Sequence, residues 1–120
     1  MINTNTNTNT NTNIKNLPAG SYWTSYGYSD AHAWIEIKRT AKTATLRPVL
    51  VTADPEWKEK MQAHVGGFFA HVGNQNEQTW IFDSIGARDV VIRETKRGWR
   101  SKHGDKFHSD RARHFHDYNF

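Results

Sequence analysis

The histidines are the residues of this sequence best suited to metal binding or proton transfer. The 120-residue chain holds seven histidines and no cysteine, so metal binding or proton transfer would rest on imidazole and carboxylate groups. His114 and His116 are separated by one residue and would point to the same face of a strand. They are the candidate metal ligands, although further ligands would have to come from elsewhere and no HExxH spacing supports them.

The histidines could also serve a metal-independent nuclease. His103, His108 and His114 lie in a basic segment, where a histidine pair could act as general acid and base while lysine or arginine stabilises the phosphate. Nothing in the sequence places one of them beside an orienting partner. The GxSxG and GxxxxGK[ST] motifs are absent. A non-enzymatic protein without a cofactor is therefore favoured, with a histidine-dependent nuclease as one alternative.

Positive charge is concentrated rather than scattered. The formal net charge is +4, but residues 88–113 hold nine Lys or Arg against four acids, a local balance of +5. Cations flank a tryptophan in KRGWRSKHG, residues 96–104, and this combination is typical of single-stranded nucleic acid binding. A second cationic segment is IEIKRTAKTATLR, residues 35–47. The predicted binding residues are Lys38, Arg39, Lys42, Lys96, Arg97, Trp99, Arg100 and Lys102.

Other interpretations of these cations stay open. A turn with two or three cations is often only well solvated, lysines can protect an edge strand, and Trp99 could fill the core. The partner could also be an acidic protein surface, because a basic face does not distinguish nucleic acid from a protein that resembles it. No zinc finger, basic zipper, helix-turn-helix or RRM pattern is present, which argues against sequence-specific binding.

The segments that must position these residues are mostly strands. Alternation and turn residues predict strands over residues 21–28, 31–39, 43–51, 66–72, 77–82 and 89–95, with Pro48 at an edge or a strand end. In the second segment Ala33, Ile35 and Ile37 would face inward, while Trp34 would share the outer face with charged residues. KRGW, residues 96–99, is predicted to be a turn.

One helix is predicted over residues 54–67. Asp54 is a suitable N-cap, Pro55 suits the first helical position, and Gly66 could end the helix in a left-handed conformation. The residues expected to face the core are Trp57, Met61 and either His64 or Val65.

Together these elements predict one mainly β domain. A small antiparallel barrel of the SH3-like type is the first choice, and a strongly bent open sheet packed on the helix is the second. Residues 17–120 form the predicted domain, and residues 1–16, with the NTNTNTNTNTN repeat at 3–13, form a predicted disordered tail. Without a targeting signal, an apolar span or cysteine, the expected location is the cytoplasm.

Two stretches resemble short, uncharacterised all-β accessory proteins of phages, plasmids and other mobile elements. They are YGYSDAHAWIEIKRTAKTATLR, residues 26–47, and the closing HDYNF, residues 116–120. Since those proteins have no established activity, the resemblance implies no site residues. It implies a small accessory protein whose partner is nucleic acid or a nucleic-acid-processing host protein. The alternative to nucleic-acid binding is inhibition of a host defence nuclease, of the anti-CRISPR or anti-restriction class, by protein–protein binding.

Overall fold

The computed structural model describes residues 12–61, 72–109 and 111–119, and it is mainly β as predicted. Three predicted features lie outside the described residues: the N-terminal repeat up to residue 11, the part of the predicted helix beyond Met61, and most of the predicted strand over residues 66–72. The elements are β1 (Ile14–Lys15), β2 (Tyr22–Tyr26), β3 (Ala31–Arg39), β4 (Thr43–Ala53), α2 (Pro55–Lys60), the 3-10 turn η2 (Gln75–Glu77), β5 (Trp80–Ile85), β6 (Val90–Thr95), β7 (Gly98–Ser101) and β8 (Lys106–His108).

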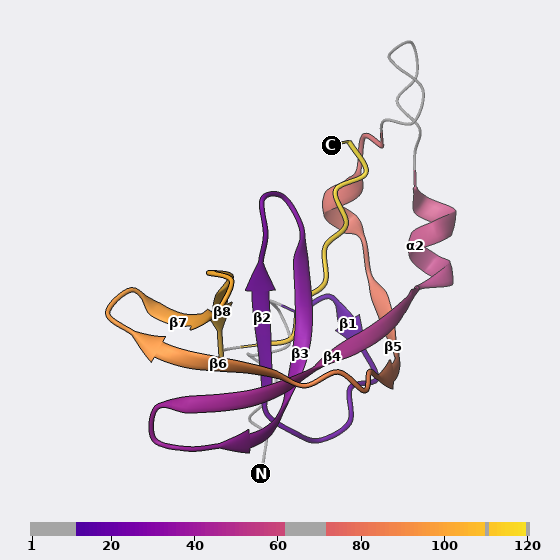
Figure 1. Ribbon diagram of the computed structural model, residues 1–120. Helices are drawn as coiled ribbons and strands as arrows, with labels where there is room; N and C mark the ends of the chain where they lie inside the picture. Colours follow the sequence, from indigo (N-terminus) through magenta and orange to yellow (C-terminus); the bar gives the residue numbers. More distant parts are fainter. Residues whose placement is uncertain (1–11, 62–71, 110, 120) are drawn as a thin grey trace.

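Six of the strands close into an antiparallel barrel (Figure 1). Their order is β4, β3, β2, β8, β7 and β6, and the ring closes because β6 pairs with the first half of β4 over Thr43–Leu46. The predicted small antiparallel barrel with one short helix is therefore confirmed. The segment beyond Thr95, read from sequence as a turn and a basic stretch, contains the two barrel strands β7 and β8.

β4 belongs to two sheets. Its second half, Val49–Ala53, pairs with β5, and β5 pairs in parallel with β1. Pro48 lies between the two halves, after the last residue paired with β6 and before the first paired with β5. Its missing N–H therefore falls where β4 changes partners, which explains how a proline can lie inside a long strand. The Gly86 backbone N–H donates a hydrogen bond to the Pro48 carbonyl at 2.8 Å.

Two hydrophobic clusters result, and β3 contributes to both. The barrel interior holds Trp23, Trp34, Ala44, Leu46, Ile92 and Phe107. The second cluster holds Ile14, Ala33, Ile35, Val49 and Ala112. β3 is thus covered on both faces. Alternation interpreted with one face of the strand toward solvent therefore misplaces some of its residues.

Trp34 was predicted to lie on the outer face of its strand and Ile37 to face inward, and both predictions are wrong. Trp34 is only 8% exposed, and its Nε1 donates to Ser25 Oγ at 2.8 Å inside the barrel. Ile37 is 45% exposed because the pairing of β3 with β4 shifts register between Glu36 and Lys38. A bulge of this kind reverses the alternation for every residue that follows it.

The helix is capped by a carboxylate that also joins neighbouring elements. Asp54 Oδ1 accepts from the Glu56 N–H at 3.0 Å, and Oδ2 accepts from Thr79 Oγ1 and from the Lys15 ammonium at 2.7 Å. These contacts, of which the hydrogen bond with Lys15 has the largest effect, hold the pKa of Asp54 below its usual range. Trp57 is fully buried as predicted, and α2 ends at Lys60, before the predicted Gly66. Within the described residues, no helix is long and apolar enough to cross a membrane.

The C-terminal segment, residues 111–119, is held by hydrogen bonds to side-chain amides, where a regular strand would be held by pairing with a neighbouring strand. Gln78 is 2% exposed, and its amide donates to the His116 carbonyl and accepts from the His116 N–H. Asn13 makes the same pair of contacts with the backbone of His114. Between them, Phe115 and Ala31 exchange two backbone hydrogen bonds. Asn13 and β1 therefore belong to the fold, upstream of the boundary at residue 16 that composition suggested.

Gly86→Ala tests whether the close approach of Gly86 to Pro48, at the point where β4 changes partners, limits stability. A Cβ at Gly86 would lie 2.7 Å from Pro48 Cγ, and the proline ring has little freedom to retreat. We expect a loss of about 1–3 kcal/mol in the free energy of unfolding, measured by urea titration. Gly73→Ala is the matched control, because a Cβ there meets nothing within 4 Å. Equal stability of the two variants would show that the crossing tolerates a side chain.

Candidate anion-binding face

The β6–β7 hairpin places two cations at the tip of a well-defined turn. Thr95 Oγ1 accepts from the Arg97 N–H at 3.1 Å and donates to the Gly98 carbonyl at 2.7 Å. Gly98 has φ +99°, a conformation that disfavours residues with a side chain. Lys96 and Arg97 therefore occupy the turn itself and are exposed.

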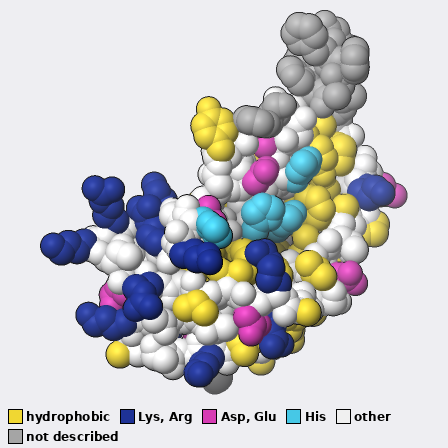
Figure 2. All heavy atoms as spheres, in the orientation of Figure 1, with side chains coloured by type: hydrophobic (Ala, Val, Ile, Leu, Met, Phe, Trp, Pro, Cys, Tyr) yellow, Lys and Arg dark blue, Asp and Glu magenta, His cyan; other side chains and the backbone are white. Residues whose placement is uncertain are grey.

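Behind this turn, three cations line up across adjacent strands on the outside of the barrel. Arg93 of β6 lies opposite Arg100 of β7, and Arg100 lies opposite Lys106 of β8. We call these three residues the cation row. Residues directly opposite in an antiparallel pair share a face. Figure 2 accordingly shows Lys and Arg side chains gathered over the part of the molecule where β6, β7 and β8 lie.

The cation row is not neutralised by ion pairs. In the part of the chain that the structure describes, the ion pairs involve other cations, such as Arg47 with Asp89 at 2.6 Å. Like charges directly opposite one another destabilise a sheet. The row therefore opposes folding locally, and an anion bound along it would relieve the repulsion.

Arg100 is held in place at the centre of the row. Its Nη1 donates to the Gly104 carbonyl at 3.3 Å and its Nη2 to the Arg97 carbonyl at 3.5 Å, so both neighbouring turns contact its guanidinium. A shallow hollow lies on each side of it. One is lined by Arg97, Gly98, Trp99, Arg100, Lys106, Phe107, His108 and Ser109, and the other by Val91, Arg93, Thr95, Arg100, Ser101 and Lys102. Arg100 borders both hollows and therefore lies between them.

The two cationic segments predicted from sequence meet at one end of the barrel. The Glu94 N–H donates to the Lys42 carbonyl at 2.9 Å, which ties the β3–β4 turn to the end of β6. Lys38 is exposed opposite Thr45 of β4, and Thr45 in turn lies opposite Val91 of β6. Lys102 is exposed and lines the second hollow. Lys38, Lys42 and Lys102 thus surround the cation row without belonging to it.

Arg39 and Trp99 close the end of the barrel. After the register shift in β3, Arg39 is opposite Ala44, a residue of the barrel interior. Its guanidinium lies 5.2 Å from the Trp99 ring and 5.4 Å from the Trp23 ring, and the two indoles meet edge to face. Arg39 Nε also donates to Glu36 Oε1 at 3.4 Å. Trp99 is half-buried against the core, so the structure gives its ring a packing role.

Sequence reasoning missed Arg93 and Lys106, which complete the cation row. Arg93 follows the buried Ile92, and Lys106 precedes the buried Phe107. Once their strands are assigned, the alternation of side chains predicts that both cations point outward. Their alignment with Arg100 depends on the register of two hairpins. The turn at Thr95–Gly98 is the sequence feature that could have predicted the alignment of Arg93 with Arg100, since the turn type sets the register of a hairpin.

The histidine pair considered for metal binding lies elsewhere and points to different neighbours. The His114 ring meets Trp80 at 4.5 Å and His32 at 5.5 Å between centroids, whereas His116 meets Tyr118 at 4.7 Å. Burial, then the neighbouring charges of His32 and His116, lowers the pKa of His114 to about 4. Among the described residues, no group of three or more His, Asp or Glu side chains could hold a metal ion.

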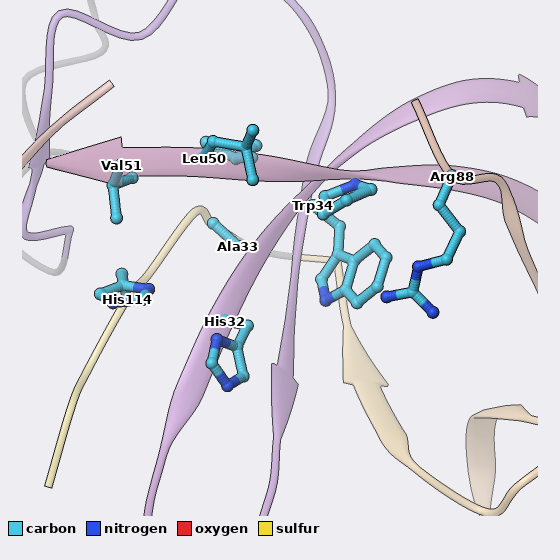
Figure 3. Close-up of a pocket in the computed structure, with 9 residues that line it drawn as sticks. His32, Ala33, Trp34, Leu50, Val51, Arg88 and His114 are labelled. Atoms are coloured by element: carbon cyan, nitrogen blue, oxygen red, sulfur yellow. The ribbon is translucent and has the colours of Figure 1, made fainter. Parts of the chain in front are cut away.

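The candidate nuclease histidines are also divided between surroundings. His108 lies on β8 with its ring 5.4 Å from that of Tyr26, beside the cation row. His114 borders a separate groove formed by β3, β4 and the C-terminal segment, where Arg88 lies 5.7 Å from the Trp34 ring (Figure 3). The two imidazoles contact different rings, and no contact joins them among the interactions of the described residues.

Comparison with known proteins assigns no family. No family model matches this sequence, and neither a curated protein nor a solved structure matches it. The properties of the face itself therefore carry the functional argument.

Stability should fall as the pH drops from about 6.5 towards 4. An unfolded histidine has a pKa near 6.5, whereas that of His114 in the folded protein is about 4, so between these values the unfolded chain binds more protons. Acid therefore favours unfolding in this window. His114→Phe should flatten the dependence of Tm on pH measured between pH 7.5 and 4.5, while the exposed control His103→Gln should leave it unchanged. An unaltered profile in His114→Phe would contradict the assignment.

Proposed function

We propose that this protein binds nucleic acid, or a complex that contains nucleic acid, through the cation row and acts without catalysis. The observation that carries the proposal is the alignment of Arg93, Arg100 and Lys106 on three adjacent strands without an ion pair among the described residues. Unpaired cations that repel one another across a sheet are a local cost to stability, and costs of this kind gather at functional sites.

The dimensions of the row favour a polyanion over a single small anion. Neighbouring strands are about 4.8 Å apart, so the row extends across roughly 10 Å of surface. That length exceeds one phosphate group and suits consecutive phosphates of one chain. Exposed Arg97 and Lys102, beside the two hollows, extend the positive charge beyond the row. Guanidinium groups, with their planar donors, are well suited to phosphate oxygens.

The same face could engage an acidic protein, as an inhibitor of a host defence nuclease would. The two partners predict different behaviour in vitro. A phosphate-binding face releases counterions and loses affinity steeply as salt rises. An inhibitor would instead bind one nuclease tightly and naked nucleic acid weakly.

The test is a salt titration with the double variant Arg93→Gln, Lys106→Gln. Binding of wild type to labelled DNA or RNA should fall steeply with salt. The double variant should reduce the slope of log affinity against log salt by about 1.4 for single strands, or 1.8 for duplex, because each lost phosphate contact contributes about 0.7 or 0.9. Arg100 is left unchanged here because its contacts with both turns make its loss a risk to folding.

The matched control is Lys58→Gln, Lys60→Gln. It removes the same number of positive charges from exposed positions on α2, where Lys60 forms only a surface ion pair with Glu77. Its slope should equal that of wild type. If both double variants lose affinity equally, net charge and not the cation row governs binding. If wild type binds neither DNA nor RNA, the proposal fails, and tight capture of one nuclease would support the inhibitor alternative.

A further inference from the structure

A groove lies where β3 and β4 stop pairing with each other. Their pairing ends at Trp34 and Pro48, and the rest of β4 pairs with β5. The first residues of β3 continue along β2, and Ala31 forms a bridge with Phe115 of the C-terminal segment. The groove is therefore a fork whose two arms are strands, each held by a different partner.

The walls of the groove are mostly apolar. Successive side chains of a regular strand point to opposite faces, yet Val49, Leu50 and Val51 all line this groove. The pairing of β4 with β5 shifts register between Leu50 and Val51, so the strand is irregular at this point. Ala33 and Trp34 line the arm formed by β3. The groove has a volume of about 410 Å³, and small-molecule sites measure roughly 300–1,000 Å³.

One end of the groove carries a positive charge. Arg88, in the loop between β5 and β6, is the only Lys or Arg among the described residues that line it, and none of these residues is Asp or Glu. Arg88 is exposed, and its guanidinium lies 5.7 Å from the Trp34 ring. The ion pairs of the described residues do not include it. An anionic ligand would balance this charge.

The other end of the groove carries two imidazoles. The rings of His32 and His114 meet at 5.5 Å, and Figure 3 shows both away from Arg88. Burial is the main reason that the pKa of His114 is lowered to about 4, so this imidazole is uncharged at neutral pH. Asp30 acts on His114, but it accepts a hydrogen bond from the Asp117 N–H and does not line the groove. The permanent charge of the groove is therefore the single charge of Arg88.

We propose that this groove binds a small organic acid, whose carboxylate pairs with Arg88 and whose hydrophobic body lies along Leu50 and Val51. A guanidinium offers two parallel N–H donors that match the two oxygens of a carboxylate. One carboxylate carries the single negative charge that one cation balances, and apolar walls favour a ligand with an apolar body. This site is separate from the cation row, and its ligand does not depend on nucleic-acid binding.

The experiment titrates the isotope-labelled full-length protein with three probes and follows its backbone amides by NMR. Phenylacetate has both a carboxylate and an apolar body, phenylacetamide has the same body without the charge, and acetate has the charge without the body. Phenylacetate should shift the amides of His32, Ala33 and Leu50 saturably, with a Kd of about 1 mM or lower. Phenylacetamide and acetate should each bind at least about tenfold more weakly, because each lacks one of the two interactions.

Variants of the two walls separate the charge from the apolar contact. Arg88→Gln should weaken phenylacetate binding about tenfold and leave phenylacetamide binding unchanged. Arg88→Lys should fall between Arg88→Gln and wild type, because an ammonium keeps the charge without the parallel donors. Leu50→Ser should weaken both phenylacetate and phenylacetamide by roughly threefold or more. Arg88 and Leu50 are exposed, so the fold should tolerate these changes, and the NMR spectrum of each variant verifies it.

Lys58→Gln is the matched control for charge. It removes one positive charge from an exposed position on α2, and phenylacetate should bind to it as to wild type. A loss of affinity equal to that of Arg88→Gln would overturn the proposal, by showing that net charge governs binding.

Four other outcomes would overturn the proposal. Equal affinity for phenylacetate and phenylacetamide would exclude pairing of the carboxylate with Arg88, and equal affinity for acetate would exclude a role for the apolar walls. Shifts confined to the amides of the cation row would place the acid there. Absence of saturable shifts up to about 10 mM phenylacetate would exclude the groove as a site. None of these outcomes bears on nucleic-acid binding, which the salt titration tests separately.

Discussion

The division of β4 between two partners is the constraint on which the rest of the structure depends. Its first half closes the barrel against β6, and its second half carries β5 and β1 away from the barrel. Pro48 and Gly86 meet at the division, where proline has no N–H to lose and only glycine leaves room beside the proline ring.

Two buried clusters follow from this division, one inside the barrel and one under the smaller sheet. β3 lies between them and is covered on both faces. The C-terminal segment completes the second cluster through Ala112, and Gln78 and Asn13 satisfy its backbone as a neighbouring strand would. Satisfying these groups matters because a buried amide without a partner is costly.

Barrel closure also creates the candidate site. Pairing of β6 with β4 and β7 turns Arg93 outward, and pairing of β7 with β8 brings Arg100 and Lys106 into line with it. At the end of the same barrel, Arg39 lies over Trp23 and Trp99, so one cation serves packing while its neighbours face solvent. Cations of similar appearance in sequence thus acquire different roles from the direction in which each strand presents them.

The sequence by itself determined the local features of this protein: mainly β structure, the capped start of α2, the turn at Lys96 and Arg97, and the concentration of positive charge. Only the tertiary structure decided which cations align, because the Arg93–Arg100–Lys106 register comes from pairing between strands. The same holds for Trp34 and Ile37, whose burial depends on a second sheet and on a bulge. Periodicity reports the alternation within one strand, whereas long-range pairing sets which face meets a core and which residues become neighbours.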